Sequence, residues 1–495
     1  MTKKNRSNNF TFIDLFAGIG GFHISLQSHG GSCLAFSEID GDAISSYCSN
    51  ISSVKEEMNI GDITKVNKLP KHDLLTAGVP CQSWSIAGRN LGFDDDRGQL
   101  WNDTIFLLRQ SKPKAFIFEN VKGLVDPRNK DSFSYILERI KLAGYYAKFF
   151  VLNSYDYGVP QNRVRVYIVG FKSKKYFSKF QHPKASKQNS TLSKLLDFEV
   201  NYEEILEKKI SSEKKLKKSA TSLTKNNDYN KYFLFNDIRN GETTIHSWDI
   251  IQTSEKQKEI CYLLLKNRRK KQYGSLDGNP LSISHLKELN SKITKSDIEG
   301  LIKLGILKAE DYKFDIIDKD IELTKDEMAL IQLSNNNQLV VDNLKTSKQL
   351  KLNRVSIIKT IESLVAKNKI RCSEVRYDFK NTKISSGLFG VNRIFLPSSD
   401  VFSTLVASDT QDHVSLIDIN AKSPEQYKQD FLDQVYKENN YRKLTKEESC
   451  LMQGFDSNFQ LPEDRKRWMK LLGNSVSIPV IDSICQEIID TGVFE

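Results

Sequence analysis

The fold is decided by a strand-like run that ends in glycines, Thr11-Phe12-Ile13-Asp14-Leu15-Phe16-Ala17-Gly18-Ile19-Gly20-Gly21-Phe22. Thr11–Phe16 is rich in residues that favour strands, and the glycines after it permit a tight turn into a helix. A turn of this kind lets backbone amides approach a ligand closely. The spacing Gly18-x-Gly20-Gly21 differs from the dinucleotide-binding pattern Gly-x-Gly-x-x-Gly, which disfavours a dehydrogenase.

Strands and helices alternate along the first third of the chain. From the apolar patterns we expect strands at 35–37, 74–77, 115–118 and 164–170, and helices at 40–49 and 100–110. This alternation predicts an α/β fold with a doubly wound, Rossmann-like sheet. Ligands of such sheets bind beyond the carboxyl ends of the strands. The residues that fall just past a strand, or in the loop after it, are Gly18, Glu38, Asp62, Cys81 and Glu119.

The composition is that of a soluble protein with a polyanionic partner. The 495 residues suffice for two or more domains, and the formal net charge of +11 favours a partner such as nucleic acid. The apolar runs are too short to span a bilayer, and the first residues lack a signal-type apolar core, so we expect a cytoplasmic protein. The seven cysteines are scattered without a Cys-x-x-Cys pair, so we expect neither disulfides nor a metal site.

The middle of the chain has a different character. Residues 171–230 hold fourteen lysines against seven acidic residues, which indicates a solvated basic linker or an ordinary soluble surface. Two segments that look alike follow it, at about 250–310 and 322–380. Each contains a pair of helices with a short turn between them, and in the second an extended stretch at 369–377 follows the helix expected at 355–366. This pattern is typical of a winged helix-turn-helix, although helix pairs also occur in cores that bind nothing.

Several motifs occur in a characteristic order. They are Phe16 to Gly21, Pro80-Cys81-Gln82-Ser83-Trp84-Ser85, Phe118-Glu119-Asn120-Val121, Gln161-Asn162-Arg163-Val164-Arg165 and Gly473-Asn474-Ser475-Val476. In this order they resemble the DNA (cytosine-C5) methyltransferase family of bacterial restriction-modification systems. The resemblance covers 10–171 and 441–489. It implies a catalytic domain formed by 1–171 and completed by 441–495, with 172–440 in the place of the target recognition region.

The resemblance gives Cys81 the role of nucleophile. C5 of cytosine is too electron-poor to take a methyl group until a thiolate adds to C6 and makes C5 an enamine carbon. The thiol must ionise, so its surroundings should lower its pKa from about 8.5. A lone cysteine is more often structural, but the flanking motif favours the nucleophile. The bulk of duplex DNA blocks access to C6, so such an enzyme must flip the base out.

Glu119, Arg163 and Arg165 are the other catalytic candidates. Thiolate addition leaves electrons on N3, and Glu119 can supply the proton there if burial raises its pKa. Arg163 and Arg165 alternate on an expected strand, so they share one face. One of them can bind O2 of cytosine and the other can brace the Cys81 loop. Paired surface arginines are the alternative.

The resemblance implies S-adenosylmethionine as the cofactor. By it, the cofactor site is lined by Phe16, Ala17, Gly18, Ile19, Gly20, Gly21, Glu38, Ile39, Asp62, Ile63, Pro80, Leu100, Asn474 and Val476. Glu38 can accept hydrogen bonds from the ribose and Asp62 from the adenine amino group, whereas both residues can also simply cap the following helices. Ile39 stands where other family members carry a bulky aromatic residue.

The expected partners are double-stranded DNA and a cognate restriction endonuclease, which the methylation protects against. The expected DNA contacts are Gln82, Ser83, Ser85 and Arg97 near the flipped base, and Arg354, Ser356 and Lys359 on the helix expected at 355–366. Two other readings are an RNA methyltransferase and a non-enzymatic regulator. The first lacks the Cys-Phe-Thr signature of the RNA-directed branch of this family, and the retained Cys81, Glu119 and Arg165 argue against the second.

Overall fold

The computed structural model describes residues 9–80, 96–185, 191–196, 232–235, 244–251, 253–276, 278–317, 322–334, 336–346, 357–380, 391, 393–419, 421 and 423–495. The chain divides into two compact units. The first unit comprises residues 1–232 and 393–495, and the second unit comprises residues 233–392. The second unit is thus an insertion between two pieces of the first.

The first unit contains the main sheet and the helices around it. Its strands are β1 (Phe10–Leu15), β2 (Gly31–Ser37), β3 (Leu74–Gly78), β4 (Ala115–Val121), β5 (Tyr146–Asn153) and β6 (Val164–Phe171). Its larger helices are α1 (Gly21–Ser28), α2 (Gly41–Asn50), α3 (Asp96–Ser111), α4 (Lys130–Leu142), α5 (Lys174–Lys179), α14 (Pro424–Asp430), α15 (Lys446–Gln453), α16 (Arg465–Asn474) and α17 (Ile478–Ile489). Three short strands, β13 (Arg393–Phe395), β14 (Asp412–Ser415) and β15 (Tyr441–Arg442), and a π-helical turn, η10 (Phe431–Tyr436), belong to the later piece.

The six strands of the main sheet run in the order β2-β1-β3-β4-β6-β5. β1 to β4 are parallel to one another, whereas β6 pairs antiparallel with both β4 and β5. The expected Rossmann-like sheet is therefore confirmed, with an antiparallel pair at one side. Because β6 runs in the opposite direction, its first residues lie at the edge where the parallel strands end, and Arg165 pairs with Val121 there.

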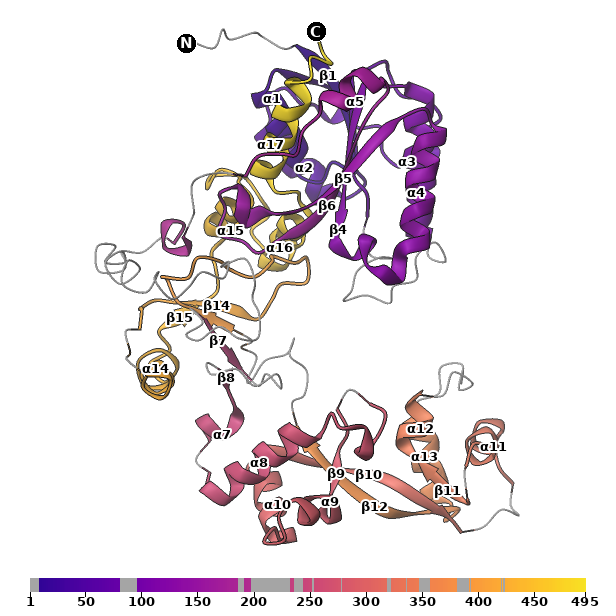
Figure 1. The fold of residues 1–495 in the computed structure, drawn as a ribbon, viewed down its shortest axis with the longest axis vertical. Coiled ribbons are helices and arrows are strands. Elements are labelled where there is room, and N and C mark those ends of the chain that lie inside the picture. The colour runs from indigo at the N-terminus through magenta and orange to yellow at the C-terminus, as the bar shows by residue number, and fades with distance from the viewer. Residues whose placement is uncertain are drawn as a thin grey trace. The chain divides into compact units, whose positions relative to one another are not determined.

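Helices from both ends of the chain cover the two faces of this sheet. Trp101 and Leu108 of α3 and Ile136 of α4 belong to the apolar cluster on one face. The cluster on the other face joins Phe22 and Leu26 of α1 to the apolar side of α17. Figure 1 shows α17, in yellow, beside α1, in indigo. The last helix, α17, therefore packs in the same apolar core as the first strand, β1, and the first helix, α1.

The second unit holds the remaining elements. They are β8 (Thr244–Ile245), α7 (Ser247–Ile250), α8 (Glu255–Asn267), β9 (Leu281–Ser282), α9 (Ile283–Leu289), α10 (Lys295–Lys303), β10 (Leu307–Ile316), α11 (Lys325–Gln332), β11 (Gln338–Val340), α12 (Val341–Thr346), α13 (Ile357–Ala366) and β12 (Ile370–Phe379), and β7 (Tyr232–Phe235) crosses its boundary. Four strands form a sheet in the order β11-β10-β12-β9. The first expected helix pair is present as α9 and α10. Of the second pair, α13 and the strand after it are described, whereas the expected first helix and turn, at 347–353, lie outside the described part of the chain.

Glycine is required at the turn between β1 and α1. Gly20 has φ +85°, and a Cβ there would lie 2.6 Å from the ring of Tyr47. A Cβ on Gly21 would lie 2.8 Å from a methyl carbon of Val476. The two glycines therefore let α1 start close to both α2 and the C-terminal segment, which sets the shape of the loop at the end of β1.

Asp14 is a fully buried carboxyl in the middle of β1. It accepts a hydrogen bond of 2.7 Å from the hydroxyl of Thr76, and no described residue donates to its second oxygen. Burial, which the Thr76 hydrogen bond only partly offsets, raises the pKa of Asp14 to about 7. In the unfolded chain the same carboxyl ionises near 3.9. The folded state therefore binds a proton that the unfolded state releases between these two values.

This difference makes Asp14 contribute a loss of stability as the pH rises from about 4 to about 7, whereas buried His23, whose pKa falls to about 4, contributes in the opposite direction over the lower part of the same range. Between pH 5 and pH 8 the loss from Asp14 amounts to about 2–3 kcal/mol, at about 1.36 kcal/mol per pKa unit. The substitution Asp14→Asn should remove this component from the pH dependence of the unfolding free energy, measured by urea denaturation at both pH values. Equal pH dependence in wild type and variant would contradict this account of Asp14.

Candidate functional site

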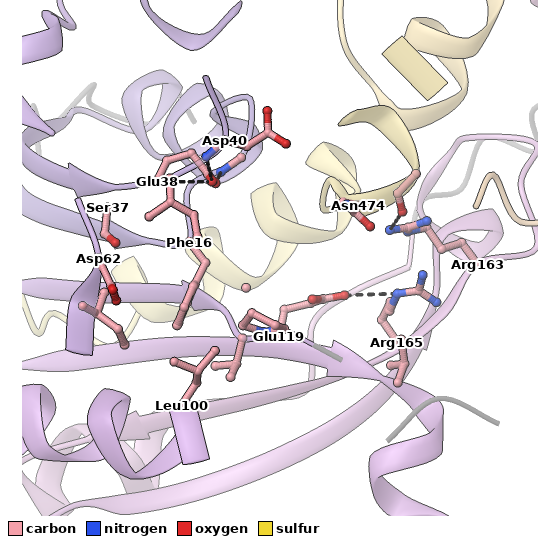
Figure 2. Close-up of a pocket in the computed structure, with 18 residues that line it drawn as sticks. Phe16, Ser37, Glu38, Asp40, Asp62, Leu100, Glu119, Arg163, Arg165 and Asn474 are labelled. Atoms are coloured by element: carbon pink, nitrogen blue, oxygen red, sulfur yellow. Dashed lines mark hydrogen bonds and ion pairs between the residues drawn. The ribbon is translucent and has the colours of Figure 1, made fainter. Parts of the chain in front are cut away.

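A cavity of about 320 Å³ opens at the carboxyl edge of the main sheet. It is lined by Phe16, Gly18, Ser37, Glu38, Ile39, Asp40, Asp62, Ile63, Gly78, Val79, Pro80, Leu100, Glu119, Val121, Arg163, Arg165, Gly473 and Asn474 (Figure 2). These residues come from the ends of four parallel strands, the start of β6 and the end of α16. The cavity therefore lies where the strand alternation predicts a ligand site.

Glu38 holds the glycine turn in place. One of its carboxylate oxygens accepts from the backbone N–H of Gly18 at 2.8 Å, and the other accepts from those of Ile39 and Asp40 at 2.8 and 2.9 Å. A carboxylate has about four lone-pair positions, so these bonds leave one for a further donor. The cap of α2 is Asp40 and not Glu38, which disfavours the reading of Glu38 as only a helix cap.

Asp62 also lines the cavity and serves as a cap. One carboxylate oxygen accepts from the backbone N–H of Thr64 at 3.0 Å and from its hydroxyl at 2.8 Å, at the start of the short 3-10 helix Ile63–Lys65. Both proposed roles of Asp62 are compatible with this geometry, because the same side chain also lines the cavity. Ile39 is 77% exposed at the rim, so it offers an apolar surface to a ligand.

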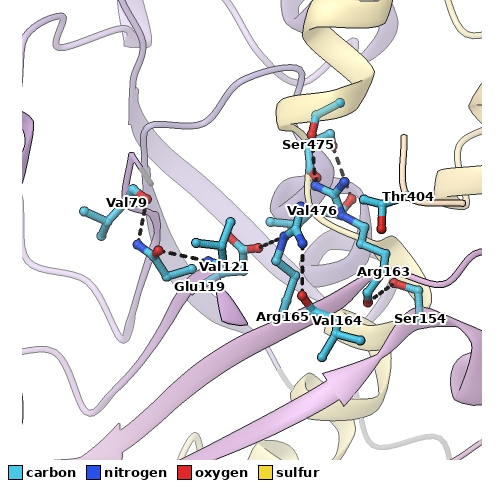
Figure 3. A network of polar contacts seen from close by, with 12 residues as sticks. Val79, Glu119, Val121, Ser154, Arg163, Val164, Arg165, Thr404, Ser475 and Val476 are labelled. Carbon is cyan, nitrogen blue, oxygen red and sulfur yellow. Dashed lines mark hydrogen bonds and ion pairs between the residues drawn. The ribbon is translucent and has the colours of Figure 1, made fainter. Parts of the chain in front are cut away.

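Glu119 and Arg165 form an ion pair in the wall of the cavity. The carboxylate oxygen Oε1 of Glu119 lies 3.2 Å from Nε of Arg165, and both side chains are largely buried (Figure 3). Burial raises the pKa of Glu119, although Arg165 and Arg163 act in the opposite direction. Next to it, the side chain of Asn120 donates to the carbonyl of Val79 at 3.0 Å and so ties β4 to the segment that leads to Pro80. The carboxyl group of Glu119 and the guanidinium of Arg165 thus lie in the same wall of the cavity.

Arg163 donates to the backbone of the C-terminal piece. Its guanidinium, 2% exposed, donates to the carbonyls of Leu405, Gly473 and Ser475 at 3.0, 3.1 and 2.5 Å (Figure 3). These carbonyls all belong to the C-terminal piece of the first unit. The donors described for Arg163 are directed at the backbone, and the catalytic roles of Arg163 and Arg165, which both line the cavity, stay predictions.

The C-terminal piece contributes to the cavity through a close backbone crossing. A Cβ on Gly473 would lie 2.3 Å from the backbone nitrogen of Ala407, so only glycine fits there. Gln161 strengthens the same junction by donating to the carbonyl of Met452 at 2.8 Å. The crossing places Asn474 in the cavity wall.

The cofactor residues expected from the sequence separate into two groups. Phe16, Gly18, Glu38, Ile39, Asp62, Ile63, Pro80, Leu100 and Asn474 line the cavity. The others lie behind it: the side chains of Ala17, Ile19 and Val476 are buried, and Gly20 and Gly21 pack against Tyr47 and Val476. The buried side chains of Ala17, Ile19 and Val476 pack in the core beneath the glycine turn and so hold its backbone in place.

Several predicted residues lie outside the described part of the chain. They are Cys81, Gln82, Ser83, Ser85, Arg354 and Ser356, and Arg97 lies in α3 with its side chain undescribed. Pro80, directly before Cys81, lines the cavity. Lys359 is exposed on α13.

Sequence reasoning missed some of the lining residues. They are Ser37, Asp40, Gly78, Val79, Val121 and Gly473. Ser37, Asp40, Val79 and Gly473 are each adjacent to a predicted residue, and Gly78 and Val121 lie two positions from Pro80 and Glu119, so extending each predicted position by two residues would have found them. Asp40 also pairs with Lys470 of α16 at 2.5 Å, and Asp42 pairs with Arg467. These pairs fix α16 against α2 at the cavity rim.

Comparison with known proteins gives consistent results. A family model described as C-5 cytosine-specific DNA methylase matches residues 10–333 and 304–490. The Type II methyltransferase M.HgiBI of Herpetosiphon aurantiacus is 37% identical over 98% of this chain and 98% of its own length. M.NlaIV of Neisseria lactamica is 30% identical over 97% of this chain and 99% of its own length. Among solved structures, the Entamoeba histolytica methyltransferase EhMeth aligns over 97% of this chain and 98% of its own, with a TM-score of 0.47 and 15% identity.

The described residues contain neither a candidate membrane span nor a candidate metal site. None of the helices there is long and apolar enough to cross a membrane. Within the same residues, no group of three or more histidine, cysteine or acidic side chains is arranged to hold a metal ion.

The Arg163 contacts predict a large loss of stability on substitution. Arg163→Met should lower the free energy of unfolding by about 3 kcal/mol or more, because it leaves three buried carbonyls without a donor. Arg165→Met, whose side chain lies at the cavity and whose partner Glu119 can take up a proton, should cost about 1 kcal/mol or less. Urea denaturation followed by circular dichroism measures both. Equal losses in the two variants would refute the distinction between them.

Proposed function

Because the chain belongs to the C-5 cytosine-specific DNA methylase family, we propose that it methylates C5 of a flipped-out cytosine in a specific duplex sequence, with S-adenosylmethionine as donor and Cys81 as nucleophile. The observation that carries the proposal is the Glu119–Arg165 pair in the wall of a cavity that is also lined by Pro80, the residue directly before Cys81. The enzyme is a DNA (cytosine-5-)-methyltransferase. The use of S-adenosylmethionine and the covalent step through Cys81 are our inference.

The cavity suits S-adenosylmethionine. Its volume of about 320 Å³ lies within the range of small-molecule sites, and its wall combines apolar side chains with a few carboxylates. Phe16 and Ile39 would contact the adenine, and Glu38 would accept a hydrogen bond from the ribose with its remaining lone pair. When bound, the cofactor supplies a methyl group on a positively charged sulfur. The chain's own residues do the rest.

Cys81 and Glu119 divide the activation of cytosine between them. The Cys81 thiolate forms a bond to C6, and the electron pair of the C5–C6 double bond moves through the ring as N3 gains a proton from Glu119. Burial raises the pKa of Glu119, which favours its role as the group that supplies this proton. C5 is then an enamine carbon that accepts the methyl group. After the methyl transfer, a base takes up the C5 proton as the thiolate departs, and the N3 proton returns to the Glu119 carboxylate, which restores the ring.

Arg165 positions the base for this addition. Its Nε is held by Glu119, and the guanidinium has further donors that can reach O2 of cytosine from the same wall. A fixed cation at O2 stabilises the negative charge that builds up on the ring as the thiolate adds. Arg163 supports this arrangement from behind, by holding the C-terminal backbone against the start of β6.

We further propose that this methylation protects host DNA in a restriction-modification system. The relatives M.HgiBI and M.NlaIV carry the name Type II methyltransferase and align with nearly the whole chain. The corresponding endonuclease would cleave the same sequence when it is unmethylated. It is a functional partner and need not contact this protein.

The covalent mechanism predicts a trapped adduct. Wild type should become covalently linked to duplex DNA that carries 5-fluorocytosine at the target position, because fluorine at C5 blocks the final elimination. Cys81→Ser should form no adduct, since a serine hydroxyl is scarcely ionised. Glu119→Gln should form it at least about 100-fold more slowly, because it cannot protonate N3. Denaturing gel electrophoresis measures the adduct. Trapping of Cys81→Ser or unimpaired trapping of Glu119→Gln would overturn the assigned roles.

The cofactor assignment predicts a difference between two carboxylates. Glu38→Gln should weaken S-adenosylmethionine binding by about 10–100-fold, because hydrogen bonds to a charged group are worth about 1.5–3 kcal/mol. Asp62→Asn should weaken it less, since Asp62 keeps one oxygen engaged with Thr64. Glu57→Gln, at an exposed position away from the cavity, is the matched control. Isothermal titration calorimetry decides, and wild-type affinity in Glu38→Gln would remove Glu38 from the binding site.

A further inference from the structure

The second unit contains the same order of elements twice. The first copy is α8, β9, α9, α10 and β10, and the second copy is α11, β11, α12, α13 and β12 (Figure 1). In both copies a helix with a capping box comes first, at Ser254 and at Thr324. A short strand, two helices and a strand of ten residues follow. The unit is therefore built from two winged helix-turn-helix copies.

The second half of each copy matches at a constant offset of 63 positions. Equivalent residues are Ile298 and Ile361, Leu301 and Leu364, Gly305 and Asn368, Leu307 and Ile370, Phe314 and Tyr377, and Asp315 and Asp378. The backbone follows the same offset, because Gly305 and Asn368 both have positive φ, at +71° and +55°. Each of these two residues ends a helix and starts the turn into a long strand. The agreement of sequence and backbone indicates an internal duplication.

The two copies are related by an approximate two-fold axis. β10 and β12 pair antiparallel, with Leu307 opposite Phe379 and Ile316 opposite Ile370. At their ends, Lys380 N–H donates to the carbonyl of Ile306 at 3.0 Å, and Ile317 N–H donates to the carbonyl of Lys369 at 2.9 Å. These two hydrogen bonds are again 63 positions apart at both donor and acceptor. Exchange of the copies therefore reproduces the same contacts.

Each copy completes the core of the other. β9 of the first copy pairs with β12 of the second, and β11 of the second pairs with β10 of the first. Tyr377 and Phe379 of the second copy belong to the apolar cluster of α8, α9 and α10. Phe314 of the first copy belongs to the cluster of α11, α12 and α13. The arrangement is the single-chain counterpart of an intertwined dimer.

The spacing of the two copies corresponds to one turn of DNA. α10 leads into the start of β10 and α13 into the start of β12, and these starts lie at opposite ends of the ten-residue ladder. At about 3.3 Å per residue, they are roughly 30 Å apart. Two-fold helix-turn-helix proteins place their second helices in successive major grooves about 34 Å apart. The segment 341–368 also has six basic against two acidic residues, which suits a phosphate backbone.

We propose that the second unit binds duplex DNA as a pseudo-dimer, with α10 and α13 in successive major grooves over two inverted half-sites. The proposal rests on the proposed function only for the choice of DNA as partner. The exposed residues of the two helices differ, because Ser296 occupies the position equivalent to Lys359 and Lys295 that equivalent to Ile358. The two half-sites should therefore be similar but not identical. A two-fold reader binds in either orientation, so one monomer can present either strand to the catalytic cavity.

The test is selection of DNA by the full chain. Randomised duplexes are selected for binding to a Cys81→Ala variant without cofactor, so that methylation plays no part. We expect two inverted half-sites with centres roughly 10 bp apart, and at least tenfold weaker binding when about 5 bp are inserted between them. Lys359→Glu and Lys295→Glu should each weaken binding about tenfold and relax the sequence preference in one half-site only. Lys325→Glu, exposed on α11 outside both helices, is the matched control and should bind as the parent does.

The outcomes separate this inference from the proposed function. A single asymmetric site, insensitivity to the inserted base pairs, or unchanged preference in both lysine variants would overturn the pseudo-dimer reading, even if methylation occurs. Inverted half-sites bound by a wild type that never methylates them would leave the pseudo-dimer intact and remove the enzymatic proposal. If Lys359→Glu instead alters self-association in sedimentation velocity and leaves DNA affinity unchanged, the surface binds a second copy and the inference is wrong.

Discussion

The buried guanidinium of Arg163 is the interaction on which the catalytic unit depends. It joins the start of β6 to three backbone carbonyls that lie far along the chain, at Leu405, Gly473 and Ser475. A buried cation is tolerated only when its donors are satisfied, so the C-terminal piece must take this position for the guanidinium to be stable. The same contact brings Asn474 to the cavity and lets α17 cover α1. An insertion of 160 residues between the two pieces is compatible with this, because the junction is specified by the pieces themselves.

The cavity keeps two carboxylates in opposite environments. Glu38 accepts three backbone hydrogen bonds at the glycine turn. Glu119 is buried beside the strand end, and the resulting rise in its pKa favours a proton donor. Both groups lie at the edge where the parallel strands end, Glu38 directly after β2 and Glu119 near the end of β4.

Sequence reasoning was accurate where the signal is local. The strands expected at 35–37 and 74–77 end within one residue of the observed ends, Ser37 and Gly78, and the helix expected at 355–366 ends at Ala366 as observed. It was less accurate where distant segments decide. The partners of Arg163 are more than 240 positions away along the chain, so the sequence could not predict that its guanidinium holds the C-terminal backbone. The sequence pattern also could not predict that the two copies exchange strands, because β9 has only two residues and its partner strand, β12, lies at the other end of the unit.

The central claim is that the product carries its new methyl group on C5 of cytosine. The most direct measurement is mass spectrometry of the nucleosides released from duplex DNA after incubation with the purified protein and isotopically labelled S-adenosylmethionine. The account predicts labelled 5-methyldeoxycytidine, formed equally in both strands of a bound site. Label in N4-methyldeoxycytidine or N6-methyldeoxyadenosine would contradict it, because a methyl group on an exocyclic amine requires neither the Cys81 thiolate nor a proton from Glu119.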